Sequence, residues 1–475
     1  MAARHQALMT SDGAAQEVDR TLEHTLAHID AGQEASLGRL FELLRIPSIS
    51  TQPKHAGDCR RAAEWLSGLL DGMGFDASVR DTPGHPIVVA HDRSDAGGPH
   101  VLFYGHYDVQ PVDPLSLWNT APFEPVVRDG AIVARGASDD KGQVMTFLEA
   151  IRALREAEGK LPVRVSIILE GEEESGGENL LPFLKANAEE LRADIALVCD
   201  TGMVGHQIPA ITTMLRGLVG EEIVISAADR DLHSGIFGNA ARNPIHVLAD
   251  IIAGLRDADG RVTLPGFYDG VTDVPDAVRS AWNAIGLTDE AALGPVGLSI
   301  PAGERGYSAL EQTWARPSCE VNGITGGYQD PGFKTVLPAK ASAKISFRLV
   351  AGQQPERIRA AFREFVQSRI PGDCSVEFRP HGGSPASAVP FDGAPLKAAL
   401  QALGEEWGRP AVTIGSGGSI PVVGELQQAL GLNALLVGFA RDDDRIHSPN
   451  EKYDLDSFQR GIRSWARILH ALAAA

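Results

Sequence analysis

The sequence predicts an α/β protein in which a layered domain with a buried, mostly parallel sheet is interrupted by a smaller α+β domain. Two observations lead to this fold class. Short aliphatic runs alternate with amphipathic helices early in the chain and again near its end, a pattern typical of strands buried between covering helices. Between these parts, strands with alternating polar and apolar residues replace the aliphatic runs, which indicates a sheet with one open face.

The aliphatic runs predict the strands of the larger sheet. Each run is short, is rich in Val, Ile, Leu or Ala, and leads on to a histidine or an acidic residue. The runs span residues 101–104, 131–133, 165–169, 195–199 and 434–439. Because ligands of open α/β sheets collect beyond the carboxyl ends of the strands, we expect these polar side chains to converge there.

The helices expected to cover this sheet have apolar residues three and four positions apart. The first spans residues 34–45 and ends before Pro47, because proline cannot continue a helix. Similar patterns predict helices over residues 60–73, 141–158 and 457–473. The helix over 141–158 follows directly on Asp139 and Asp140, so these two carboxylates are expected at its start.

The inserted domain is predicted from the change of pattern. Ala341, Ile345 and Leu349 alternate with polar residues in one half-buried strand, residues 341–350. Further strands are expected at residues 220–227 and 375–379, and helices at residues 244–255 and 354–369. Residues 260–306 are rich in glycine and proline and show little periodicity. We therefore place the insert at residues 211–387 and the two halves of the larger domain at residues 1–210 and 388–475.

Composition limits the possible functions. A chain of 475 residues is too long for one ordinary core, which supports two domains. It carries 43 basic and 62 acidic residues, and this net charge of −19 argues against nucleic acid or an anionic membrane as a partner. The polar N-terminus lacks the apolar core of a signal peptide, and no apolar stretch is long enough to span a bilayer, so we expect a cytoplasmic protein.

The acidic motifs have simple interpretations when each is taken alone. The tract from Glu170 to Glu174 holds four carboxylates within five residues, which repel one another unless water or a cation neutralises them. It could be a solvated acidic turn. Asp139 and Asp140 could simply cap the following helix and interact with its dipole.

The histidines are equally ambiguous in isolation. His106 and Asp108 could form a hydrogen-bonded core pair, and His447 could be an ordinary loop residue. Asp200 alone says little. The expected convergence of all these groups favours a bound cation instead. Thiolates are not expected to contribute, because the four cysteines are scattered and form no CxxC pair.

Four motifs acquire a definite meaning in combination. They are His106-Tyr107-Asp108-Val109-Gln110-Pro111, Ser138-Asp139-Asp140-Lys141-Gly142, Glu172-Glu173-Glu174-Ser175-Gly176 and His447-Ser448-Pro449-Asn450-Glu451. Together they resemble the di-zinc metallopeptidase family that contains carboxypeptidases, aminoacylases and dipeptidases. The tyrosine after the first histidine and the motif Asp231-Leu232-His233-Ser234-Gly235 resemble the carnosinase-type dipeptidase branch. The resemblance covers essentially the whole chain from about residue 35.

The resemblance implies two metal ions that share one carboxylate. One ion would be held by a histidine and an aspartate, the other by a glutamate and a histidine, and a second aspartate would bridge them with a water. In that order, these residues are His106, Asp200, Glu174, His447 and the bridging Asp139. Carboxylates combined with imidazoles suit Zn²⁺, with Mn²⁺ as the alternative.

The resemblance also assigns roles around the ions. Glu173 would be the general base, and Asp108 would orient His106 through its second ring nitrogen. The family has a cis peptide bond after the bridging aspartate, which corresponds to Asp139-Asp140 in this chain.

In the insert, the resemblance implies substrate contacts. His233 would reach the active site of a partner subunit and stabilise the tetrahedral oxyanion. Arg348 would bind the free carboxylate of the substrate, a role suited to a guanidinium group. Further substrate contacts would come from Thr335, His381 and Ser419. Some relatives carry glutamate where this chain has Ser416, which leaves the substrate preference open.

These expectations describe a metal-dependent dipeptidase that cleaves dipeptides with a free C-terminal carboxylate, using a metal-bridging water activated by Glu173. A homodimer formed through the inserted lid and dimerisation domain is expected, with a small peptide as substrate. One alternative is an N-acyl amino-acid or carbamoyl amidohydrolase on the same fold. Another is a non-catalytic metal-binding scaffold, although a scaffold has no need of an unligated base such as Glu173.

Overall fold

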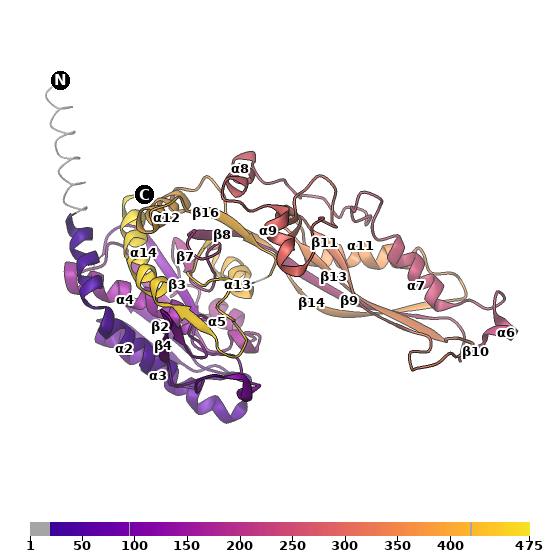
Figure 1. Ribbon diagram of the computed structural model, residues 1–475, viewed down its shortest axis with the longest axis horizontal. Helices are drawn as coiled ribbons and strands as arrows, with labels where there is room; N and C mark the ends of the chain where they lie inside the picture. The colour runs from indigo at the N-terminus through magenta and orange to yellow at the C-terminus, as the bar shows by residue number, and fades with distance from the viewer. Residues whose placement is uncertain (1–19, 95, 419) are drawn as a thin grey trace, which may run out of the picture. The chain divides into compact units, whose positions relative to one another are not determined.

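The structure is a computed structural model that describes residues 20–94, 96–418 and 420–475. The chain divides into two compact units, and Figure 1 labels many of their elements. The first holds the described residues up to Thr212 together with Val389–Thr413 and Glu425–Ala475, and the second holds Thr213–Ala388 and Ile414–Gly424. No helix in the described ranges combines the length and apolar character needed to cross a membrane.

A large sheet forms the centre of the first unit. Its strands follow the order β1 (Phe75–Arg80), β2 (Ile87–Asp92), β6 (Arg164–Glu170), β3 (His100–His106), β7 (Ile195–Val198) and β17 (Ala434–Val437), and the start of β8 (Ala210–Leu215) extends it. Strands β6, β3, β7 and β17 are parallel neighbours, whereas β1, β2 and β8 pair antiparallel toward the edges. The predicted α/β fold with a buried, mostly parallel sheet is confirmed.

Helices and sheet enclose one hydrophobic core in this unit. The helices are α2 (Gln33–Leu44), α3 (Ala56–Gly72), α4 (Lys141–Glu158), α5 (Leu180–Ala186), α12 (Ala394–Trp407), α13 (Pro421–Leu430) and α14 (Leu455–Ala474). Phe103 of β3 stacks on Phe147 of α4 with ring centroids 3.8 Å apart, and Trp465 of α14 meets both rings edge-on. Such aromatic packing anchors α4 and α14 to the parallel strands.

One aliphatic run does not join the large sheet. Residues 131–133 form β5 (Ala131–Val133), which lies in a separate antiparallel sheet between β4 (Val126–Arg128) and β18 (Lys452–Asp454). The aliphatic pattern predicts burial correctly but cannot identify the partner strands, so this part of the prediction was wrong. As a result, Asp139 comes from the loop before α4 and not from the end of a central strand.

The second unit is built on a four-stranded antiparallel sheet. Its order is β11 (Ser318–Gly326), β13 (Lys340–Leu349), β9 (Gly217–Ser226) and β14 (Ser375–Ser384). One face packs on α7 (Pro244–Ala253) and α11 (Pro355–Gln367), where Ile223, Phe347 and Phe362 are buried. The alternation of polar and apolar residues in β13 therefore separates a covered face from an open one.

Shorter elements complete the second unit. They are β10 (Leu232–His233), α6 (Ser234–Phe237), α8 (Asp276–Ala284), α9 (Asp289–Leu293), α10 (Ala309–Trp314), β12 (Val336–Leu337), β15 (Ser387–Ala388) and most of β16 (Val412–Ser416). Helices α8 and α9 lie in residues 260–306, where little periodicity was expected. Both are brief, and α8 buries only Val278 and Trp282, so their apolar pattern is too short to stand out in the sequence.

Candidate metal centre

The first candidate ligand group gathers at the carboxyl ends of the parallel strands. His106 is the last residue of β3 and is fully buried, and Asp200 follows the neighbouring strand β7. The Nε2 atom of His106 lies 3.1 Å from Oδ1 of Asp139. One ligand atom from each of these three residues lies within 4.8 Å of the other two. These residues come from three separate segments: His106 and Asp200 lie at the ends of neighbouring parallel strands, and Asp139 comes from the loop before α4.

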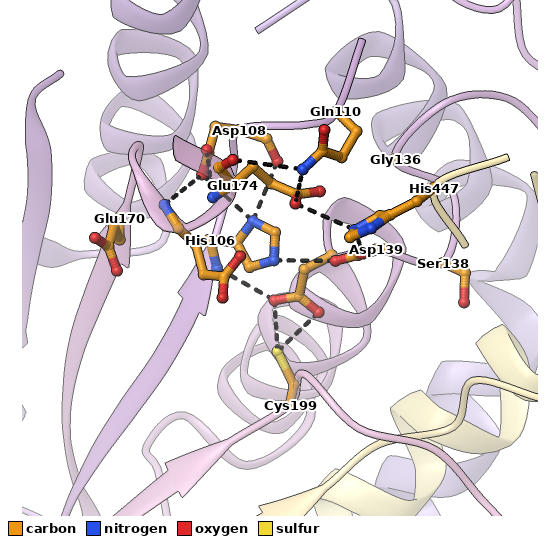
Figure 2. Close-up of polar contacts among 12 residues, drawn as sticks. His106, Asp108, Gln110, Gly136, Ser138, Asp139, Glu170, Glu174, Cys199 and His447 are labelled. Carbon is orange, nitrogen blue, oxygen red and sulfur yellow. Dashed lines mark hydrogen bonds and ion pairs between the residues drawn. The ribbon is translucent and has the colours of Figure 1, made fainter. Parts of the chain in front are cut away.

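The second candidate group shares Asp139 with the first (Figure 2). The Nε2 atom of His447 lies 3.0 Å from Oδ2 of Asp139 and 3.1 Å from Oε2 of Glu174. His106 thus faces one carboxylate oxygen of Asp139, and His447 faces the other. This is the arrangement expected of a carboxylate that bridges two cations.

Asp108 connects the end of β3 to the acidic turn. Its backbone carbonyl lies 3.1 Å from Nδ1 of His106, and its carboxylate lies 3.4 Å from the same nitrogen. The carboxylate also accepts hydrogen bonds from the backbone N–H groups of Glu173 and Glu174, at 3.3 and 3.0 Å. Asp108 therefore holds both glutamates beside His106. The peptide bond between Asp139 and Asp140 is cis, which confirms the expectation.

The four glutamates of the acidic tract have different partners. The buried Glu170 accepts a hydrogen bond from the hydroxyl of Tyr104 at 2.5 Å. The carboxylate of Glu172 accepts from the backbone N–H of residue 85 and from the side-chain amide of residue 179, so it fixes neighbouring loops. Glu174 pairs with His447. Glu173 belongs to neither candidate ligand group, although in sequence it lies between Glu172, which fixes neighbouring loops, and the candidate ligand Glu174.

The charges of these groups strongly perturb one another. Burial, together with the charges of Asp139 and Asp140, raises the pKa of Asp200 well above its usual value. Burial also raises the pKa of Glu173. Hydrogen bonds to Asp139 and Glu174 raise the pKa of His447 to about 10. A concentration of carboxylates in a buried place needs positive charge to offset it.

The donor set fits two divalent cations. It offers two imidazoles and three carboxylates, and one of the carboxylates is common to both groups. Imidazole with carboxylate suits Zn²⁺ and, with lower affinity, Mn²⁺. Gln110 completes the surroundings, because its side-chain amide donates to Oε2 of Glu174 at 2.7 Å. Sequence reasoning assigned no role to Gln110, although the motif that contains His106 includes it.

Two of the predicted substrate contacts lie on the open face of the second unit's sheet. Arg348 of β13 pairs with Leu218 of β9, and His381 of β14 pairs with Gly220 two residues further along β9. Both side chains therefore emerge on the same face. Within the described residues, the Arg348 guanidinium forms no ion pair, and burial together with its charge lowers the pKa of Arg216 to about 10. An anion would relieve the repulsion between these two guanidiniums.

The other two described candidates lie together elsewhere in this unit. The exposed His233 belongs to β10, and its Nδ1 accepts a hydrogen bond from the backbone of Gly235 at 3.0 Å. Strand β10 pairs with β12, and the N–H of Ser234 donates to the carbonyl of Thr335 at 3.1 Å. The fifth candidate, Ser419, lies outside the described residues.

Residues 102–471 match Peptidase family M20/M25/M40. The chain belongs to this family. This M20 chain is 31% identical to the Cys-Gly metallodipeptidase dug1 of Schizosaccharomyces pombe over 463 residues, which cover 94% of the chain and 97% of the relative. The family and the carnosinase-type branch expected from the motifs are confirmed, and the M20 chain is a metallopeptidase.

Further relatives of the M20 chain include the Beta-Ala-His dipeptidase of Homo sapiens. It is 28% identical over 471 residues, which cover 95% of the chain and 93% of the relative. Among solved structures, the M20 family metallo-carboxypeptidase Sso-CP2 of Sulfolobus solfataricus matches with a TM-score of 0.77 and 31% identity, covering 93% of this chain and 99% of that one. Each of these relatives thus matches 93–95% of the M20 chain.

Proposed function

We propose that this M20-family metallopeptidase is a dipeptidase that hydrolyses dipeptides with a free C-terminal carboxylate. The observation that carries the proposal is the position of Glu173 beside two ligand groups that share Asp139. The names of two full-length relatives, a Cys-Gly metallodipeptidase and a Beta-Ala-His dipeptidase, support the same activity.

Five residues would hold the ions. His106 and Asp200 would bind one cation, Glu174 and His447 the other, and Asp139 would serve both. We expect Zn²⁺, with Mn²⁺ as the alternative. When bound, two such ions polarise the scissile carbonyl and lower the pKa of water. Asp108 would keep His106 in the orientation required for binding.

Glu173 would move the proton. Its carboxylate is outside both ligand groups and is therefore free to accept a proton and return it, and burial raises its pKa. It would take a proton from water as the water oxygen attacks the carbonyl carbon. It would then pass that proton to the departing amine nitrogen as the C–N bond breaks, which leaves a carboxylic acid and a free amine.

Arg348 would bind the substrate carboxylate from the open face of the second unit's sheet. A guanidinium forms two parallel hydrogen bonds with a carboxylate, and Arg348 has no competing acidic partner among the described residues. His381 emerges on the same face and would add a second contact. Thr335 and Ser419 remain further proposed contacts.

We propose that His233 acts in the site of a partner subunit. From the Arg348 pair at Leu218, strand β9 continues to Ser226, about 26 Å of extended chain. Figure 1 shows β10, which carries His233, beyond that end of the sheet. One chain therefore offers Arg348 and His233 at opposite ends of the same sheet. A homodimer could bring both to one substrate, and the homodimer and a cytoplasmic location both remain predictions.

A substrate panel with metal analysis tests the proposal. Dipeptides, N-acyl and N-carbamoyl amino acids, and longer peptides would be assayed on one preparation, and the metal content of the same preparation would be measured. We expect two divalent ions per chain and the highest kcat/KM for dipeptides. Preference for acylated or carbamoylated amino acids would replace the dipeptidase assignment with the amidohydrolase alternative. Metal binding without any hydrolysis would favour the scaffold.

A further inference from the structure

We propose that Glu451 is a positioning residue that holds Asp139 in place for both metal ions. The inference rests on the two-metal centre proposed above. Glu451 follows His447 by four residues in the same loop and is fully buried, with a relative exposure of 0%. It belongs to neither candidate ligand group.

Both oxygens of the Glu451 carboxylate bind the segment that leads to Asp139. Oε1 accepts hydrogen bonds from the backbone N–H groups of Ser138 and Asp139, at 2.9 and 3.0 Å. Oε2 accepts one from the N–H of Gly136 at 3.0 Å and one from the guanidinium of Arg135 at 2.7 Å. Four donors use the whole accepting capacity of the carboxylate. All the hydrogen bonds of the Glu451 carboxylate therefore serve to hold this segment in place.

Asp444 and helix α4 also restrain the same segment. The hydroxyl of Ser138 donates to the buried carboxylate of Asp444 at 2.7 Å, and Lys452 pairs with that carboxylate at 3.0 Å. The segment also touches the start of α4, where a Cβ added to Gly142 would lie 1.9 Å from the carbonyl oxygen of Ala137. Close packing against α4 and the hydrogen bonds to Glu451 and Asp444 together restrain the segment.

Placement of Asp139 matters for both ions because each of its oxygens faces a different histidine. A shift of its backbone would move both oxygens at once. Glu451 also joins two parts of the site, since it lies in the loop of His447 and binds the segment of Asp139, 312 residues away in sequence. Loss of a residue that supports metal ligands typically costs 10- to 100-fold in metal affinity. Here the loss should affect both ions.

The test compares metal affinities of Glu451→Gln and the wild-type chain. Apo-protein would be titrated with Zn²⁺ in competition with a chelator, which resolves the two binding steps. The glutamine keeps the shape but presents an NH₂ group to donors that need an acceptor. We expect both steps to weaken by roughly 10- to 100-fold. Glu149→Gln is the matched control, because the buried Glu149 of α4 binds Arg39 and Ser36, which lie outside the site.

Two further variants cover the case in which Glu451→Gln fails to fold. Arg135→Gln combined with Glu451→Gln avoids an unpaired buried guanidinium, and Ser138→Ala removes only the hydroxyl bond to Asp444. We expect the double variant to weaken both steps and Ser138→Ala to weaken both by less.

The outcomes separate this inference from the proposed function. Weakening of both steps in a folded variant, with unchanged affinities in Glu149→Gln, supports it. Wild-type affinities in folded Glu451→Gln or in the folded double variant overturn it, and so does a loss confined to one ion. In these cases the two-metal proposal stands. A wild-type chain that binds fewer than two ions overturns the two-metal proposal, and the role of Glu451 with it.

Discussion

Glu173 differs from the glutamates on either side of it. Glu172 accepts hydrogen bonds from nearby loops, and Glu174 belongs to a candidate ligand group, whereas the Glu173 side chain does neither. Replacing it with glutamine should remove proton transfer and leave the ligands in place. We expect Glu173→Gln to lower kcat by about 10²- to 10⁴-fold, the contribution of general acid–base catalysis, with two ions still bound. Steady-state kinetics and metal analysis on the same sample would measure this.

Glu172→Gln is the control for this change, since Glu172 contacts nearby loops and neither His106 nor His447. It should reduce kcat far less than Glu173→Gln. Loss of an ion from Glu173→Gln would instead make Glu173 a ligand, and normal turnover would remove it from the mechanism.

Arg348 should contribute to binding mainly when the substrate carries a negatively charged C-terminal carboxylate. A hydrogen bond to a charged group is worth about 1.5–3 kcal/mol, so Arg348→Met should lower kcat/KM for free dipeptides by roughly 10- to 100-fold. The same dipeptides with a C-terminal amide should be almost unaffected. Arg379→Met is the control, because the exposed Arg379 already pairs with Glu377. An equal loss on both substrates would mean that Arg348 supports the fold and not the carboxylate contact.

At the scale of residues, the sequence identified the polar groups but not all of their partners. His106, Asp200 and the acidic tract were visible because each directly follows an aliphatic run, and the ends of parallel strands meet at one edge. The bonds from Glu451 to the segment of Asp139 were not visible, because they join residues 312 positions apart. Gln110 was missed for a similar reason, since its partner Glu174 lies on another segment.

At the scale of elements, prediction succeeded where the nearby sequence contains both a long apolar pattern and a residue that ends the element. Helix α4 spans Lys141–Glu158, the predicted range, because its apolar pattern is long and Gly159 ends it with a left-handed φ of 77°. Strand β5 was assigned to the wrong sheet, since three aliphatic residues do not determine their partners. The domain bounds and the lid role of the insert remain predictions.

The first turn of α4 offers a test of how closely an element supports the site. A methyl group at Gly142 would collide with the backbone carbonyl of Ala137, whereas one at Gly38 in α2 would meet no atom within 4 Å. We expect Gly142→Ala to lower the free energy of unfolding by about 1–3 kcal/mol, the usual cost of overpacking. Gly38→Ala should raise it by about 0.5–1 kcal/mol. Chemical denaturation measures both changes, and equal effects would show that the start of α4 can adjust freely.

At the scale of the whole molecule, metal binding should be coupled to stability. Ions that bind only the folded chain stabilise it by about 2.7 kcal/mol per site at a concentration 100 times the dissociation constant. The pKa of Asp200 is raised by burial and by the charges of Asp139 and Asp140, and bound cations would offset these charges. Chelation should therefore lower the melting temperature of the first unit in calorimetry, and Zn²⁺ or Mn²⁺ should restore it. Mg²⁺ should restore little, because it prefers oxygen ligands in an octahedral arrangement.

The separation of Arg348 and His233 within one chain leads to a test that requires two chains. In a mixed dimer of His233→Ala and Glu173→Gln subunits, carrying different tags so that it can be purified, one site would combine an intact Glu173 with the intact His233 of the other subunit. The second site would lack both groups. If His233 acts across the dimer, the mixed dimer should recover about half of the wild-type kcat, while each parent variant stays inactive. If His233 serves its own chain, each site lacks one group and no activity returns. A chain that stays monomeric at assay concentrations would contradict the trans arrangement, because no second subunit could then supply the histidine.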